Sequence, residues 1–109
     1  MSTINKVEAE HDSQFLAFST VIHIDSERMI RRLCKHFAHK VNAHWSSECG
    51  HIEFDMGFCD MNGSGDQLDL RCGANSDAEL KEVIDCIDSH FLRFAKGVEC
   101  SLQWNLMNS

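Results

Sequence analysis

Apolar positions in the first half of the chain recur with the period of an α-helix. At about 100° per residue, one stripe of the predicted helix contains Ile30, Leu33, Phe37 and Val41. The opposite side of the same stretch is polar and charged. The pattern therefore predicts a helix over residues 26–42 that packs one side on a core and exposes the other side to solvent.

A second stretch of helical periodicity lies in the last third of the chain. Apolar residues keep helical spacing over residues 80–94, which predicts the second helix. Ser76 and Glu79 have the spacing of a capping box just before it. For the first helix, either Asp25 or Ser26 is the expected N-cap.

Strand-like alternation, with apolar residues at every second position, marks six further stretches. They are residues 18–24, 41–47, 51–56, 58–61, 67–72 and 98–104. In the first of these, the alternation assigns Phe18, Ile22 and Ile24 to the buried face. Residues 62–66 have the composition of a hairpin turn.

Together these elements give the order β-α-β-β-β-β-α-β. Each helix has one apolar stripe and each clear strand has one apolar face, which two packed layers satisfy. The sequence therefore predicts an α+β two-layer sandwich, in which two helices cover one face of a mostly antiparallel sheet. We expect a single domain over residues 15–109, preceded by a flexible N-terminal segment at residues 1–14.

The composition is that of a globular protein. The chain has 109 residues, 43% of them hydrophobic and 25% charged. No apolar run approaches the ~18 residues of a membrane span, and no secretory signal pattern is present, so we expect a cytoplasmic protein without a membrane segment. The six cysteines form no C-x-x-C pair and mostly lie in apolar patterns, which indicates reduced thiols.

Positive charge is concentrated in the first predicted helix of an otherwise acidic chain. The formal net charge is −7, yet residues 28–40 contain five of the ten Lys and Arg residues and no acid. An acidic chain is a poor general binder of nucleic acid, because neutralising phosphates needs an extended basic surface. The basic helix is thus better suited to a small anion or to an acidic patch on a partner protein.

Histidines and cations of the two predicted helices form the candidate site. Its residues are Lys35, His36, His39, Lys40, His90 and Arg93. Imidazole, ammonium and guanidinium groups together suit an anion such as phosphate, carboxylate or catecholate. In the alternative interpretation the histidines are satisfied by carbonyls or acids within the fold, and the lysines only keep the surface soluble. We assign no catalytic residue and no metal ligand.

A rival hypothesis is a small metal-binding protein or enzyme that uses His36, His39 and His90. On a helix, the first two imidazoles project about 60° apart, and a third ligand has to come from elsewhere. The chain contains no zinc, haem, P-loop, dinucleotide or nucleophile-elbow motif, so the sequence does not identify a cofactor and the cofactor is unknown.

Several short strings resemble a known family. Residues 33–40, which read LCKHFAHK, are similar to the signature of a small bacterial family known only as a domain of unknown function. Residues 50–54 with 57–59 resemble its central hairpin, and residues 89–95 resemble the end of its C-terminal helix. An aromatic final strand around Trp104 completes the likeness.

The resemblance implies a cytoplasmic α+β domain without an established activity, whose relatives occur near, or fused to, flavoproteins of iron–siderophore utilisation. Combined with the residues above, it leads to one expectation. We expect a non-enzymatic module whose cationic helix face binds a small anion, an anionic iron chelate or an acidic partner protein.

Overall fold

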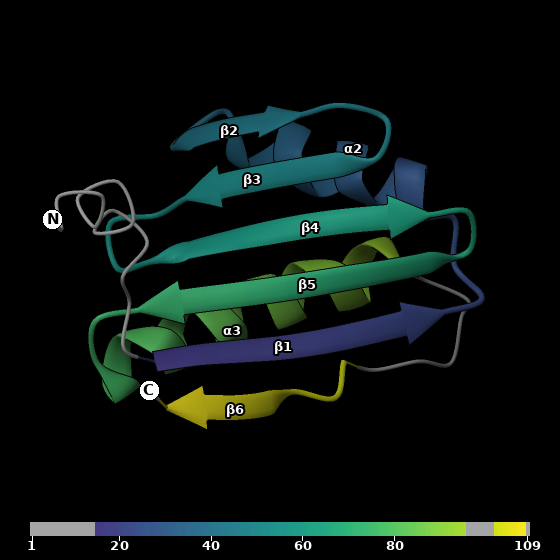
Figure 1. Cartoon of the computed structure of the whole chain (residues 1–109). Helices are drawn as coiled ribbons and strands as arrows, with labels where there is room; N and C mark the ends of the chain where they lie inside the picture. Colours follow the sequence, from purple (N-terminus) through teal and green to yellow (C-terminus); the bar gives the residue numbers. More distant parts are fainter. Residues whose placement is uncertain (1–14, 96–101, 109) are drawn as a thin grey trace, which may run out of the picture.

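The computed structural model describes residues 15–95 and 102–108. Its elements are β1 (Phe15–Ile22), α2 (Ser26–Phe37), β2 (Asn42–Trp45), β3 (Cys49–Glu53), β4 (Phe58–Ser64), β5 (Gln67–Ala74), α3 (Asp77–Phe94) and β6 (Asn105–Asn108). The six strands form one sheet in the order β2-β3-β4-β5-β1-β6, and every pairing in it is antiparallel. Both helices lie behind this sheet in Figure 1. The predicted α+β class and element order are confirmed.

The core lies between the sheet and the two helices. Helix α2 packs on β2, β3 and β4, whereas α3 packs on β5 and β1. The fully buried side chains are apolar or thiol groups, with the largest ones being Phe91, Ile30, Leu33, Ile52, Met61, Leu68, Leu70, Ile87, Val83, Cys34, Cys59 and Cys72. Within the described part of the chain, no helix is long and apolar enough to cross a membrane.

Side chains cap both helices at the predicted places. Asp25 is the N-cap of α2, and its carboxylate accepts a hydrogen bond from the Arg28 N–H at 3.1 Å. The Ser76 hydroxyl oxygen likewise accepts from the Glu79 N–H at 3.1 Å, and Ser76 Oγ lies 3.2 Å from Glu79 Oε1. These bonds satisfy N–H groups that a helix leaves free in its first turn.

The tip of the β4–β5 hairpin holds the start of α2. Its turn is formed by Gly65 and Asp66, where Gly65 has a φ of 62°. The Gly65 carbonyl accepts hydrogen bonds from Ser26 N–H at 3.2 Å and from Ser26 Oγ at 2.9 Å, and the Asp66 carbonyl accepts from Ile24 N–H at 3.0 Å. Two chain segments far apart in sequence are thereby joined where the helix begins.

The predicted length of the first helix is wrong. Helix α2 ends at Phe37, and the following residues 38–40 form a turn. The Phe37 carbonyl accepts hydrogen bonds from both Lys40 N–H and Val41 N–H at 2.9 Å, which closes the helix. Because β2 begins at Asn42, the backbone has to leave the helical conformation before that residue.

The predicted face of the first strand is also wrong. Ala17, Ser19 and Val21 point into the core, whereas Ile22 is 56% exposed. The register explains this, since Ala17 lies opposite Cys72 and Val21 lies opposite Leu68, whose side chains are buried. Alternation alone did not identify the inner face, because apolar residues occupy both faces of β1.

The last strand begins later than the sequence pattern suggests. Residues 98–101 of the predicted strand lie outside the described residues, as does the predicted flexible segment 1–14. Residues 102–104 are irregular, and β6 begins at Asn105. The indole N–H of Trp104 donates to the Asp88 carboxylate at 2.9 Å, so this segment is attached to α3 and does not pair with β1.

All five described cysteines are free, as the sequence predicts, and Cys100 lies outside the described residues. Cys59 and Cys72 lie opposite each other on β4 and β5 and have no exposed surface. Burial raises the pKa of the Cys34 thiol to about 11. These three thiols therefore act as small apolar groups of the core.

We expect Gly57→Ala to destabilise the fold by about 2–3 kcal/mol, because an added Cβ has no room to move away. That Cβ would lie 2.3 Å from the backbone oxygen of Gly73 and 2.9 Å from a Val83 methyl group. Gly65→Ala is the control: its Cβ meets no atom within 4 Å, and only the positive φ costs about 1–2 kcal/mol. Urea denaturation measures both values, and a Gly57→Ala loss no larger than that of Gly65→Ala would contradict this packing.

Candidate functional site

Two histidines of the candidate site meet where α2 packs beside α3. The His36 and His90 ring centroids are 4.6 Å apart, and His36 also contacts the Phe94 ring edge-on at 5.8 Å. His90 Nδ1 lies 2.8 Å from the Cys86 carbonyl oxygen, so this nitrogen is the donor, and the hydrogen bond fixes the orientation of the ring. Both helices thus contribute imidazole to one shared junction.

Arginines extend this junction along α2. The Arg32 guanidinium lies 4.9 Å from the centroid of the Phe94 ring, a cation–π contact between the helices. Arg28, Arg32 and His36 follow one another at four-residue spacing and so project from the same side of α2. Sequence analysis did not include Arg28 and Arg32 in the site, although their spacing from His36 was a usable signal.

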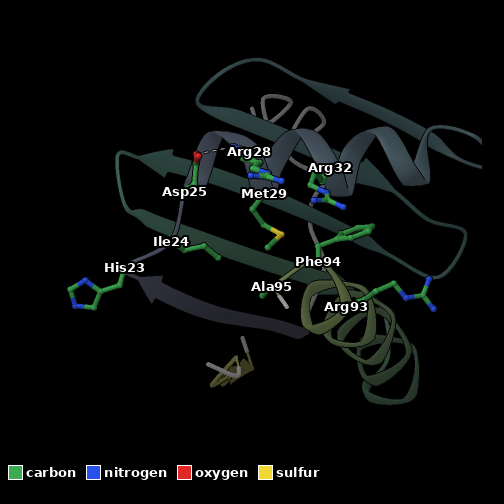
Figure 2. Close-up of a pocket in the computed structure, with 9 residues that line it drawn as sticks. All are labelled: His23, Ile24, Asp25, Arg28, Met29, Arg32, Arg93, Phe94 and Ala95. Carbon is green, nitrogen blue, oxygen red and sulfur yellow. Dashed lines mark hydrogen bonds between the residues drawn. The ribbon is translucent and has the colours of Figure 1, made fainter. Parts of the chain in front are cut away.

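Two neighbouring grooves follow this row of side chains. The first has a volume of about 550 Å³ and is shown in Figure 2, where Arg28 and Arg32 lie near Met29 and Phe94. The second, of about 380 Å³, is lined by Arg31, Arg32, Lys35, His36, His39 and Phe94. Because Arg32 and Phe94 line both grooves, the two form one continuous surface, which we call the cationic groove.

The structure gathers most of the predicted site residues around this groove. Lys35, His36 and His39 line its second part, and Arg93 lines its first part. His90 contacts His36 from α3. Lys40 lies outside both parts; with His39 it belongs to the turn after α2, not to the helix face that the sequence predicted.

The cations of the groove have no acidic partner among the residues that the structure describes. The ion pairs found there involve His23, His51 and Arg71, and none involves a Lys or Arg of α2 or Arg93. The resulting positive field acts on His36. Desolvation lowers the pKa of His36, and the charges of His90, Arg93 and the turn after α2 lower it further.

A different polar row crosses the uncovered face of the sheet. His51 of β3 lies opposite Asp60 of β4, which lies opposite Arg71 of β5. His51 Nδ1 is hydrogen-bonded to the Asp60 carboxylate, and its Nε2 is bonded to Glu53 at 2.8 Å. Burial opposes the imidazolium, but the two carboxylates outweigh it and raise the pKa of His51. Both ring nitrogens are therefore engaged within the fold.

The rival metal site finds no support in this geometry. Within residues 15–95 and 102–108, no group of three or more His, Cys, Asp and Glu side chains is arranged to hold a metal ion. His39 lies beyond the end of α2, in the turn at residues 38–40.

A protein-family model described as an uncharacterized protein conserved in bacteria matches residues 18–105. The chain belongs to the DUF2218 family. This membership confirms the resemblance to a bacterial domain of unknown function. No curated protein matches this DUF2218 chain.

Among solved structures, this DUF2218 chain is similar to the NMR structure of PA4090 from Pseudomonas aeruginosa. The two share 24% sequence identity with a TM-score of 0.71, and the alignment covers 84% of this chain and 95% of PA4090. At that identity the similarity shows the fold alone. The function therefore has to be argued from the groove itself.

We expect Arg93→Gln to raise the pKa of His36, because the substitution removes one of the positive charges that disfavour its imidazolium. NMR titration of the His36 ring protons measures this value. Lys81→Gln removes an equal charge from an exposed position of α3 and serves as the control. An unchanged His36 pKa in Arg93→Gln would contradict the described field.

We expect His51→Gln to reduce stability in a pH-dependent way. The folded pKa of His51 lies above its ordinary value of 6.5, so its contribution is full below pH 6.5 and is lost as pH rises through the folded pKa. Below pH 6.5 the loss is about 1.5 kcal/mol, typical of a hydrogen bond to a charged group. Urea denaturation across this pH range tests it, with His44→Gln as control, and a pH-independent loss would contradict it.

Proposed function

We propose that this DUF2218 chain is a cytoplasmic, non-enzymatic binding module that holds a small anion in the cationic groove between α2 and α3. The observation that carries the proposal is the row of cations that form no ion pair. The chain has 17 acidic residues, and Asp25 lines the groove, yet no described carboxylate forms an ion pair with this row.

Guanidinium groups favour an oxyanion in this position. Arg28 and Arg32 present planar N–H forks, which bind carboxylate or phosphate through two parallel hydrogen bonds. Lys35 and His36 add further donors along the same groove. A ligand that spans the groove thus meets donors from several successive turns of one rigid helix.

The size and charge of the protein favour a small ligand over a long polyanion. Helix α2 has 12 residues, and the formal net charge of −7 means that the rest of the chain repels nucleic acid. A compact anion enters the local positive field without meeting that acidic surface. An anionic iron chelate or an acidic patch on a partner protein would use the same donors, and a link to iron–siderophore utilisation is part of this proposal.

Phosphate serves as the probe in the first test. We expect inorganic phosphate to raise the melting temperature of the protein by mass action, and sodium chloride at equal ionic strength not to do so. We expect Arg32→Gln to weaken phosphate binding about tenfold, since a hydrogen bond to a charged group contributes about 1.5 kcal/mol.

Lys81→Gln is the matched control for this test, because it removes one positive charge at an exposed position that lines neither part of the groove. Chemical shifts of α2 amides report the site independently of stability. Phosphate binding that is equally weakened in both variants, or shifts confined to other elements, would refute the proposed site.

A further inference from the structure

We propose that the part of the cationic groove shown in Figure 2 binds an aryl carboxylate, with the carboxylate on Arg28 and Arg32 and the aromatic ring between Met29 and Phe94. This inference rests on the proposed function and names the ligand class for it. Four observations carry it: the room in the groove, its floor, the geometry of its arginines and the position of one acid.

The groove has more room than an inorganic oxyanion needs. Its volume is about 550 Å³. This value falls within the roughly 300–1,000 Å³ that is typical of sites for small organic molecules. A bare phosphate would leave much of that space to water, so the volume favours a ligand that carries an organic group as well as a charge.

The floor of the groove is apolar. Ile24, Met29 and Ala95 line it; because Met29 and Ala95 are almost fully buried, the partly exposed Ile24 and the neighbouring Phe94 offer most of the apolar surface. Water on such a floor finds no hydrogen-bond partner in these side chains, and an apolar ligand group that displaces it gains the hydrophobic contribution. The thioether of Met29 also forms favourable contacts with aromatic rings.

The arginines leave their donors free for a flat acid. The Arg32 guanidinium carbon lies 4.9 Å from the centroid of the Phe94 ring, and none of the ion pairs among the described residues uses its N–H groups. Arg28 lies one turn earlier on the same side of α2, whereas Arg93 extends away from the other labelled side chains in Figure 2. The carboxylate of an aromatic acid lies close to the plane of its ring, so the ligand can meet these donors and the floor together.

One acid in the groove selects for a single negative charge. Asp25 lines the same groove, where its carboxylate accepts from the Arg28 backbone N–H. A ligand with two charges would bring the second one toward this carboxylate, which is unfavourable in a partly desolvated site. The groove therefore favours a monocarboxylate over a dicarboxylate or a phosphate dianion.

Isothermal titration calorimetry with 2-naphthoate tests the inference. We expect 2-naphthoate to bind about tenfold more tightly than either acetate or inorganic phosphate, and neutral 2-naphthalenemethanol to bind more weakly than 2-naphthoate. We expect both Arg28→Gln and Phe94→Leu to reduce 2-naphthoate affinity. Lys81→Gln is the matched control, since Lys81 is an exposed cation of α3 that lines neither part of the groove.

The outcomes separate this inference from the proposed function. If phosphate binds and 2-naphthoate binds no better than acetate, the ligand class is wrong and the anion-binding function stands. If neither binds, both are wrong. If the neutral alcohol binds as tightly as 2-naphthoate, or if Lys81→Gln weakens 2-naphthoate as much as Arg28→Gln, the role of the Arg28–Arg32 pair is wrong. Should Phe94→Leu fail to fold, the comparison of ligands and the Arg28→Gln and Lys81→Gln variants still decide the question.

Discussion

The close approach of α2 to the sheet is the constraint on which the candidate site depends. A Cβ built on Gly50 would lie 2.9 Å from both Cys34 Sγ and an Ile30 methyl group, and one built on Gly63 would lie 2.6 Å from Ser26 Oγ. The helix therefore rests on two strands at positions where only hydrogen fits. This contact fixes the rotation of α2 about its axis, and with it the side on which the arginine row emerges.

The uncovered face of the sheet and the helical layer differ in how their charged side chains are paired. On the uncovered sheet face, His51, Asp60 and Arg71 lie on adjacent strands, so opposite charges meet across the sheet. On the helical layer, Arg28 and Arg32 lie at four-residue spacing on α2, and the Arg32 guanidinium contacts the Phe94 ring of α3 instead of a carboxylate. None of the ion pairs among the described residues involves α2.

Local signals were enough to predict most of the fold, because helix caps and apolar periodicity act over a few residues. The N-cap of α2 and the capping box at Ser76 are examples. The inner face of β1 depends instead on its pairing with β5, since Ala17 and Val21 compete with Phe18 and Ile22 for burial. The end of α2 likewise depends on where β2 begins to pair. Such effects come from tertiary contacts that a single sequence does not display.

In the candidate site too, the features set by local sequence could be predicted, and those set by tertiary contacts could not. The cationic helix and its histidines follow from sequence, but the groove exists only because α3 places Phe94 beside Arg32 and His90 beside His36. Sequence reasoning chose the histidines and the cations closest to them in the chain. Arg28 and Arg32 were missed, although both lie in the same basic stretch, because the contact of Arg32 with Phe94 is tertiary.

The tip of the β4–β5 hairpin not only connects two strands but also positions the start of α2 through hydrogen bonds. Most hairpin tips accept inserted residues freely, because nothing else in the molecule relies on their length. Here the carbonyls of Gly65 and Asp66 are spaced to receive the N–H groups of Ser26 and Ile24. The two-residue tip should accordingly keep its length, because an inserted residue would move these carbonyls away from the start of α2.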